Sequence, residues 1–206
     1  MDTVQRKHII IFFGMTASGK SHLSTAWARK CGFRRFNTDV VRKEYIVMPD
    51  GGAFAESGIG KGMYSPEMSK KTYEKLLELA EEALAEPSVS CVVLDGSFQR
   101  AHDRIHVIER FHHKVLPLFI LCRCSDQVTR CRLARRCTDP MAVSDGDVDV
   151  YLHQLVKFEN PTEIPRMQLL ELDTDAPLEY LIERLETFLA QAGLIKQNHA
   201  GSAKIE

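Results

Sequence analysis

No stretch of the sequence stays apolar over the ~20 residues that a membrane-spanning helix needs, and the N-terminus lacks an apolar segment followed by a cleavage site. Charge of one sign is not in excess either, because 27 Lys and Arg oppose 28 Asp and Glu, for a net charge of −1. Proteins that coat nucleic acid or bind membranes through basic segments need a large excess of basic residues. These absences exclude both classes and predict a cytoplasmic protein without a membrane segment.

The six cysteines lack the paired C-x-x-C spacing of common zinc sites. A chain of 206 residues can bury one substantial core and needs no disulfides to hold it. We therefore expect reduced thiols that pack as small apolar side chains. The alternative is a metal bound by the four cysteines that gather in one region, Cys122, Cys124, Cys131 and Cys137.

Apolar runs alternate with helical patterns along the chain. Strands are predicted at 8–13, 33–37, 89–94, 116–122 and 167–172. Helices are predicted at 20–30 with a stop at Gly32, from Thr38 or Asp39 as the cap, from Ser65 as the cap to before Pro87, at 100–114, from Ser125 or Asp126 as the cap, at 148–158 and from 178 to near Gly193. This alternation predicts an α/β fold, a three-layer α/β/α sandwich around a five-stranded, mostly parallel sheet with right-handed crossovers.

The chain is predicted to form one domain over residues 1–195, followed by a disordered tail over 196–206. Residues 50–64 contain five glycines and show neither a helical nor a strand period, so we predict a loop there.

Residues 14–21, GMTASGKS, match the pattern G-x-x-x-x-G-K-[ST] at every position. They follow a predicted strand and open a predicted helix, which is the context that a phosphate-binding loop requires. The glycines allow backbone N–H groups and the positive end of the helix to converge on a phosphate. Lys20 adds a cation toward the β- and γ-phosphates, and the Ser21 hydroxyl can coordinate Mg²⁺. We predict an ATP site formed by Gly14, Thr16, Ala17, Ser18, Gly19, Lys20 and Ser21.

The stretch VSCVVLDGSF places Asp95 at the end of an apolar strand. A carboxylate in this position organises Mg²⁺ through water, so Ser21 and Asp95 are the predicted metal residues. Motors that hydrolyse nucleotides commonly carry a glutamate next, and Gly96 stands there instead. The sequence therefore favours transfer of the phosphoryl group over its hydrolysis by a motor.

The stretch FNTDVVRKEY places Asp39 just beyond the second strand, at the sheet edge where ligands of open α/β folds bind. A carboxylate there can accept the proton of an attacking hydroxyl, and Arg42 lies one turn along the same helix face. Asp39 as a plain helix cap is the alternative. The phosphate-binding loop upstream favours the catalytic interpretation.

A basic helix later in the chain carries Arg132, Arg135 and Arg136, and the segment at about 130–147 is predicted to be a lid. Phosphoryl transfer spreads negative charge over the equatorial oxygens, and cations from a closing segment stabilise that charge. We assign Arg132 and Arg136 to catalysis and Arg135 to the nucleotide. A solvated basic helix face is the alternative for each of them.

Four stretches, GMTASGKS, NTDVVRKEY, MYSPEMSKKTYEKLLELAEEAL and VVLDGSF, resemble P-loop kinases of the zeta-toxin-like or AAA_33 type. The chain looks like the kinase module that some bacterial proteins join to an aminoglycoside-phosphotransferase-like domain. It is more distantly similar to polynucleotide 5′-kinases and chloramphenicol phosphotransferase. The resemblance covers roughly residues 9–173 and is strongest before residue 98.

The resemblance implies a role for particular residues. By similarity to the D-x-x-R motif of polynucleotide kinases, Asp39 is the general base and Arg42 contacts the substrate. By similarity to the family's lid helix, at least one of Arg132, Arg135 and Arg136 closes over the γ-phosphate. The sequence carries no partner domain of the kind that often defines the substrate in this family, so the acceptor stays open.

We therefore expect a kinase that uses ATP and Mg²⁺ and phosphorylates a hydroxyl of a small molecule, as a monomer or weak dimer. A kinase of nucleic-acid 5′-hydroxyl groups is the second hypothesis, although the nearly neutral charge does not favour a nucleic-acid partner. A binding protein switched by nucleotide is the third.

Overall fold

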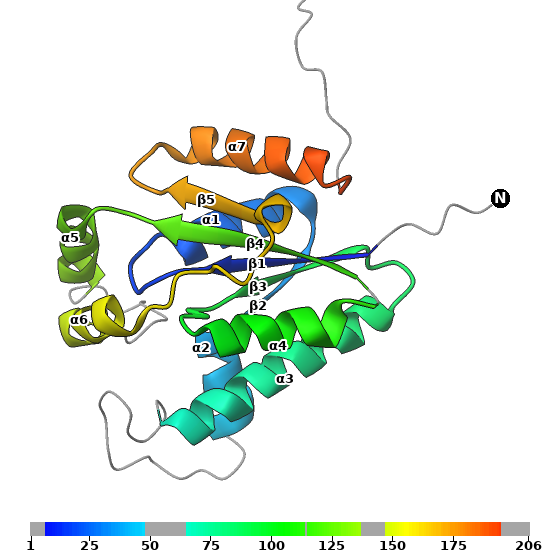
Figure 1. The fold of residues 1–206 in the computed structure, drawn as a ribbon, viewed down its shortest axis with the longest axis horizontal. Coiled ribbons are helices and arrows are strands. Elements are labelled where there is room, and N and C mark those ends of the chain that lie inside the picture. Colours follow the sequence, from blue (N-terminus) through cyan, green and yellow to red (C-terminus); the bar gives the residue numbers. More distant parts are fainter. Residues whose placement is uncertain (1–6, 48–64, 114, 137–146, 195–206) are drawn as a thin grey trace, which may run out of the picture.

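The computed structural model describes residues 7–47, 65–113, 115–136 and 147–194. The predicted loop at 50–64, most of the predicted lid and the tail from 196 lie outside these residues. One sheet of five parallel strands has the order β2-β3-β1-β4-β5 (Figure 1). The strands are β1 (His8–Phe13), β2 (Arg34–Asn37), β3 (Cys91–Asp95), β4 (Leu116–Arg123) and β5 (Leu169–Asp173). The predicted parallel α/β sheet is confirmed.

Helices cover both faces of the sheet (Figure 1). Helices α1 (Lys20–Cys31) and α7 (Leu178–Gln191) lie on one face, and α3 (Pro66–Ala85) and α4 (Ala101–Phe111) on the other. The remaining elements are α2 (Thr38–Val41), η1 (Arg42–Val47), α5 (Asp126–Arg136), α6 (Val148–Lys157) and η4 (Arg166–Gln168). Helices α5 and α6 lie at the carboxyl ends of the strands. No helix within the described ranges is long and apolar enough to cross a membrane.

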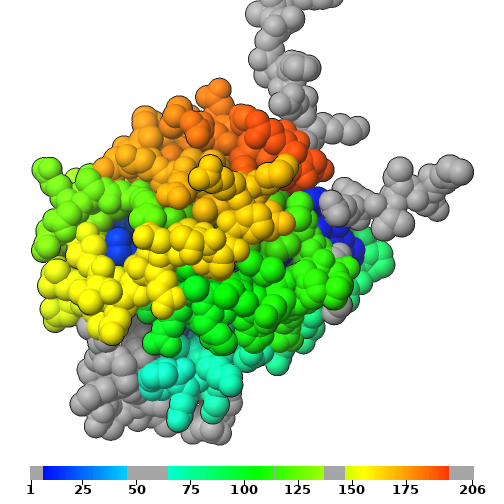
Figure 2. Space-filling view, viewed as in Figure 1, coloured from blue at the N-terminus to red at the C-terminus, as the bar shows by residue number. Residues whose placement is uncertain are grey.

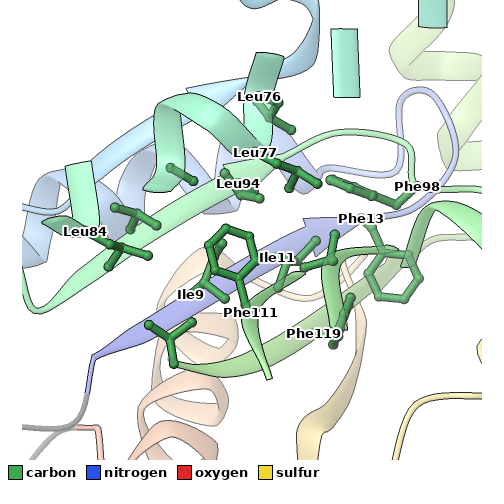
Figure 3. Packing of buried hydrophobic residues seen from close by; sticks show 14 of the residues in the cluster. Ile9, Ile11, Phe13, Leu76, Leu77, Leu84, Leu94, Phe98, Phe111 and Phe119 are labelled. Atoms are coloured by element: carbon green, nitrogen blue, oxygen red, sulfur yellow. The ribbon is translucent and has the colours of Figure 1, made fainter. Parts of the chain in front are cut away.

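The central strand β1 is buried on both faces, which explains its uninterrupted apolar run. Ile9, Ile11 and Phe13 belong to the core beneath α3 and α4, where Leu76 and Phe111 also lie (Figure 3). The alternate residues of β1 face the core beneath α1 and α7. Burial of each large apolar side chain contributes about 1.5–3 kcal/mol to stability, so these two cores hold the strand ends in place.

Local signals at the helix ends agree with most of the sequence predictions. Helix α1 stops at Gly32, whose φ of 69° is left-handed. The Ser65 hydroxyl accepts a hydrogen bond from the Met68 N–H at 3.3 Å and caps α3, and the Ser125 hydroxyl caps α5 in the same way.

Several predicted boundaries are wrong. Helix α4 ends at Phe111 and not at 114. The cap of α2 is Asn37, one residue before the predicted Thr38 or Asp39, because its side chain reaches the free N–H groups of the first turn. Strand β3 begins at Cys91, two residues after the predicted start. Strand β5 begins at Leu169, because the 3₁₀ turn η4 occupies the preceding residues.

The described cysteines are free thiols, as predicted. Cys91 and Cys122 are buried in strands of the sheet. Within the described ranges, no group of three or more His, Cys, Asp or Glu side chains could hold a metal ion. Cys137 lies outside these ranges.

Candidate active site

The loop between β1 and α1 has a backbone that ordinary residues rarely adopt. Gly14 has φ 142°, and a Cβ built there would lie 2.3 Å from the carbonyl oxygen of Cys122. Ala17 and Gly19 also have positive φ, at 56° and 82°. Such torsions turn successive N–H groups toward one side, which is the geometry that binds anions. No side chain within the described residues caps α1, so its N-terminal N–H groups are left for a ligand.

A cavity of about 440 Å³ lies beside this loop. Its walls come from the start of α1, from α5, from the segment that follows β5 and from the start of α7, and they include Lys20, Ser21, Arg132, Arg136, Thr174 and Leu181. Figure 2 shows the same end of the molecule, where blue atoms from the N-terminal part of the chain are visible in a hollow between α5 and α6, although no described residue of α6 lines the cavity. The Lys20 ammonium group donates to the carbonyl oxygen of Met15 at 3.1 Å. The cavity is therefore positively charged and partly apolar, as a nucleotide requires.

The three predicted lid arginines have different surroundings. Arg132 donates to the carbonyl oxygens of Ala17 (3.2 Å) and Thr174 (2.7 Å), so its guanidinium group ties the loop to the segment after β5. Arg136 reaches the Thr16 hydroxyl at 3.4 Å and lines the cavity. Arg135 is exposed and does not line it. The structure brings two of the three arginines to the phosphate-binding loop.

Asp95 is fully buried at the end of β3. Its Oδ2 accepts from the Ser24 hydroxyl (3.1 Å) and the Asn37 amide (2.9 Å), and it forms an ion pair with Arg35. Its Oδ1 has no hydrogen-bond partner among the described residues. A buried carboxylate oxygen without a partner is costly unless a further ligand satisfies it.

Asp39 and Arg42 form an ion pair on consecutive helical elements, with Oδ1 and Nη1 3.2 Å apart. The Arg42 side chain is 9% exposed and that of Asp39 is 22% exposed. The carboxylate is thus held by a buried arginine and remains open to a ligand on one side. The sheet register pairs Asn37 with Asp95, so this ion pair follows a strand end that lies beside Asp95.

Gly96 leaves no room for the glutamate that a nucleotide-hydrolysing motor would carry after Asp95. A Cβ built on Gly96 would lie 2.6 Å from Cγ2 of Thr38 and 3.1 Å from the ring of Phe98. Real Cβ atoms do not approach a neighbour as closely as 2.6 Å. The packing of β3 against the start of α2 therefore requires glycine here.

Tyr73 of α3 faces the turn after Gly96. Its hydroxyl accepts from the Phe98 N–H at 3.0 Å and lies 3.2 Å from the Ser97 hydroxyl. Burial, and then the negative charge of Asp103, raise the pKa of Tyr73 to about 12. Tyr73 stays a neutral hydrogen-bonding group at the edge of the site.

Sequence reasoning missed three polar residues that support the site. The Thr174 hydroxyl donates to the Ser18 carbonyl oxygen at 2.7 Å, and Gln154 of α6 accepts from the Thr16 N–H at 2.6 Å. Asn37 contacts both Asp95 and the start of α2. Thr174 directly follows a strand and Asn37 precedes a helix, so the predicted strand and helix ends could have indicated both residues. Gln154 sits in a helix without a motif, and no sequence signal could have found it.

The residues present fit ATP and Mg²⁺. The uncapped helix start and Lys20 suit a polyphosphate. Mg²⁺ prefers oxygen ligands and keeps several of its waters, and the exposed Ser21 hydroxyl and the unsatisfied Oδ1 of Asp95 are oxygen ligands of the kind it needs.

The solved structures of similar fold include two kinases and a nucleotide complex. A gluconokinase from Sinorhizobium meliloti 1021 has a TM-score of 0.57 and 20% identity, with 91% of this chain and 94% of that chain covered. A sugar kinase from Janibacter sp. HTCC2649 has a TM-score of 0.62 and 19% identity, with 91% and 96% covered. Kti12 from Chaetomium thermophilum, solved with ADP-AlF3, has a TM-score of 0.62 and 16% identity, with 91% and 98% covered.

At these identities the likeness shows a shared fold. No curated protein matches the chain. Residues 9–161, which run from β1 through the segment after α6, match the AAA domain family designated AAA_33. Because this match spans most of the chain and includes the phosphate-binding loop, the protein belongs to the AAA_33 family of AAA domains.

Proposed function

We propose that the protein is a kinase that uses ATP and Mg²⁺ and transfers the γ-phosphoryl group to a hydroxyl of a small-molecule acceptor. The observation that carries the proposal is the placement of the Asp39–Arg42 ion pair beside Asp95, at the same sheet edge as the phosphate-binding loop. A carboxylate near a nucleotide site, with no room for a water-activating glutamate at position 96, suits transfer to a hydroxyl.

Each group has a role in the proposed reaction. The acceptor oxygen attacks the γ-phosphorus while Asp39 takes the hydroxyl proton, and ADP leaves with the electron pair of the broken P–O bond. Lys20 and Arg136 offset the charge on the phosphoryl oxygens, and Arg132 keeps the loop in place. Mg²⁺, held through Ser21 and Asp95, would neutralise charge on the β- and γ-phosphates.

A small, hydroxyl-rich acceptor is favoured over a nucleic acid. The net charge of −1 supplies no general attraction for a polyanion. The similar solved structures include a gluconokinase and a sugar kinase, and we extend the substrate class of those proteins to this chain as part of the proposal. The proposal includes a cytoplasmic location and a monomer or weak dimer, which rest on the sequence alone.

The test is ADP release with MgATP and a panel of acceptors that includes sugars, sugar acids, nucleosides and 5′-hydroxyl oligonucleotides. Asp39→Asn should lower kcat for the best acceptor by about 10²–10⁴-fold, because general base catalysis contributes that much. Its dissociation constant for MgATP should stay within about twofold of the wild type, because Asp39 does not line the nucleotide cavity.

Glu44→Gln is the matched control, since it removes one exposed carboxylate charge from the next helical turn. It should leave both constants unchanged. Tight MgATP binding without acceptor-stimulated ADP release would overturn the kinase in favour of a nucleotide switch. A preference for the oligonucleotides would instead support a kinase of nucleic-acid 5′-hydroxyl groups.

A further inference from the structure

We infer that Asn37 is a positioning residue that couples Asp95, the proposed cation ligand, to the helix that carries Asp39, the proposed base. The inference rests on the proposed function, because it concerns the two carboxylates of that reaction. It assigns a role to a side chain that touches neither the nucleotide cavity nor a reacting atom.

The two ends of the Asn37 side chain face the two halves of the site. Its Nδ2 donates to Oδ2 of Asp95 at 2.9 Å. Its Oδ1 accepts from the N–H groups of Asp39 at 3.0 Å and Val40 at 3.1 Å. The residue is 8% exposed, so solvent has little access to these bonds. Among short side chains only an amide offers a donor at one end and an acceptor at the other, which is what this position uses.

On the Asp95 side, Asn37 shares one oxygen with two other donors. Ser24 and Arg35 also reach Oδ2, while Oδ1 has no hydrogen-bond partner among the residues described. Because Oδ2 is held from three directions, the orientation of Oδ1 is fixed before any ligand arrives. A ligand that binds Oδ1 and moves the carboxylate must therefore strain the hydrogen bonds at Oδ2. Asn37 donates one of those bonds.

On the Asp39 side, the helix depends on its cap. Helix α2 spans only Thr38–Val41 and continues as the π-helical turn η1. One turn of helix has little stability of its own, and a side-chain cap contributes about 0.5–2 kcal/mol. The direction in which Asp39 points is therefore set largely by Asn37. A single amide group with its own rigid geometry connects this cap to the metal carboxylate.

The coupling can be observed as amide hydrogen exchange, which does not require turnover. MgATP should raise the protection of the Asp39 and Val40 amides in the wild-type protein by about fivefold or more, the low end of ordinary coupling between sites. ATP with EDTA should raise it less, because the effect passes through Asp95. The exchange of both amides is to be followed by NMR of the 206-residue chain.

Asn37→Ser separates the two contacts. A serine hydroxyl still caps α2 but is too short to reach Asp95, so the amides should stay protected without ligand and lose the response to MgATP. Its half-saturating Mg²⁺ concentration should rise while the acceptor KM stays within about twofold of the wild type. Asn37→Ala removes both contacts and should lower kcat as well. Asn37→Thr is the second variant if the serine variant does not fold.

The control is Ser65→Ala, which removes a cap of the same kind from α3 without touching Asp95. It should lower the melting temperature and keep the MgATP response. The coupling is overturned if Asn37→Ser keeps the full response, or if the wild type binds MgATP without any change at Asp39 and Val40. A wild type that shows the response but phosphorylates no acceptor would overturn the kinase proposal and leave the coupling standing. A wild type that does not bind MgATP would overturn both.

Discussion

At some positions of the site, the residue type is set by contacts with residues that are distant in the sequence. Gly14 is required because the Cys122 carbonyl oxygen approaches it, and Gly96 because Thr38 packs against it. The first glycine belongs to a motif that any reader of the sequence would single out. The need for the second glycine is explained by the structure, in which Thr38 leaves no space for a larger side chain next to Asp95. A glycine of the phosphate-binding motif and a glycine outside that motif are therefore both constrained by packing.

Tyr73 gives a prediction at this scale. Its pKa is raised to about 12, first by burial and then by Asp103, whereas the phenol of an unfolded chain titrates near 10. Below pH 10 the phenol is neutral in both states and its contribution to stability is complete. As the pH rises from 10 to 12, the unfolded state loses the proton first, so the contribution is lost.

Urea unfolding at a series of pH values measures this effect. Between pH 9 and pH 12, the wild type should lose about 2 kcal/mol more unfolding free energy than Tyr73→Phe, which cannot ionise. The variant also loses the bond from the Phe98 N–H, so the two curves should be offset at pH 9 and converge at high pH. Curves that stay parallel would show that the phenol titrates alike in both states.

At the scale of elements, Arg104 of α4 joins two segments that border the site. It is fully buried, donates to the carbonyl oxygens of Phe98 (2.7 Å) and Glu159 (2.9 Å), and forms an ion pair with Glu163. One guanidinium group thus holds the turn after β3 against the segment that follows α6. Removing one partner of a buried pair leaves an uncompensated charge.

Arg104→Met should therefore lower the free energy of unfolding by about 3–5 kcal/mol. Arg123→Met is the control, because Arg123 and its partner Glu171 are about half exposed and such pairs contribute at most about 1 kcal/mol. Chemical denaturation of both variants makes the comparison. An equal, small loss in the two variants would show that Arg104 does not connect these segments.

Most elements could be predicted from the sequence because their signals are local. The apolar run of β1, the glycine after α1 and the Ser65 cap each act within a few residues, and each is where the sequence places it. The cap of α2 was predicted one residue late, because Asn37 ends a strand and caps a helix at the same time. The start of β5 was displaced by a turn that has no strong signal of its own.

At the scale of the whole molecule, the site depends on the order of the strands, which the alternation of strands and helices does not specify. Placing β1 between β3 and β4 brings Asp95 and the segment after β4 to either side of the phosphate-binding loop. Thr174 and Gln154 reach the loop from positions more than 130 residues away. Contacts of this range follow from the packed fold and could not be predicted from spacing along the chain.

The central claim is that the loop at residues 14–21 binds a nucleotide triphosphate. Isothermal titration of the intact chain with MgATP tests it directly, with Lys20→Ala as the matched variant and circular dichroism to show that both proteins are folded. We predict one site with a dissociation constant between about 1 μM and 1 mM, the usual range for enzyme substrates, and binding at least about tenfold weaker in the variant, equivalent to 1.4 kcal/mol. A folded wild-type protein that binds neither MgATP nor MgGTP would contradict the account.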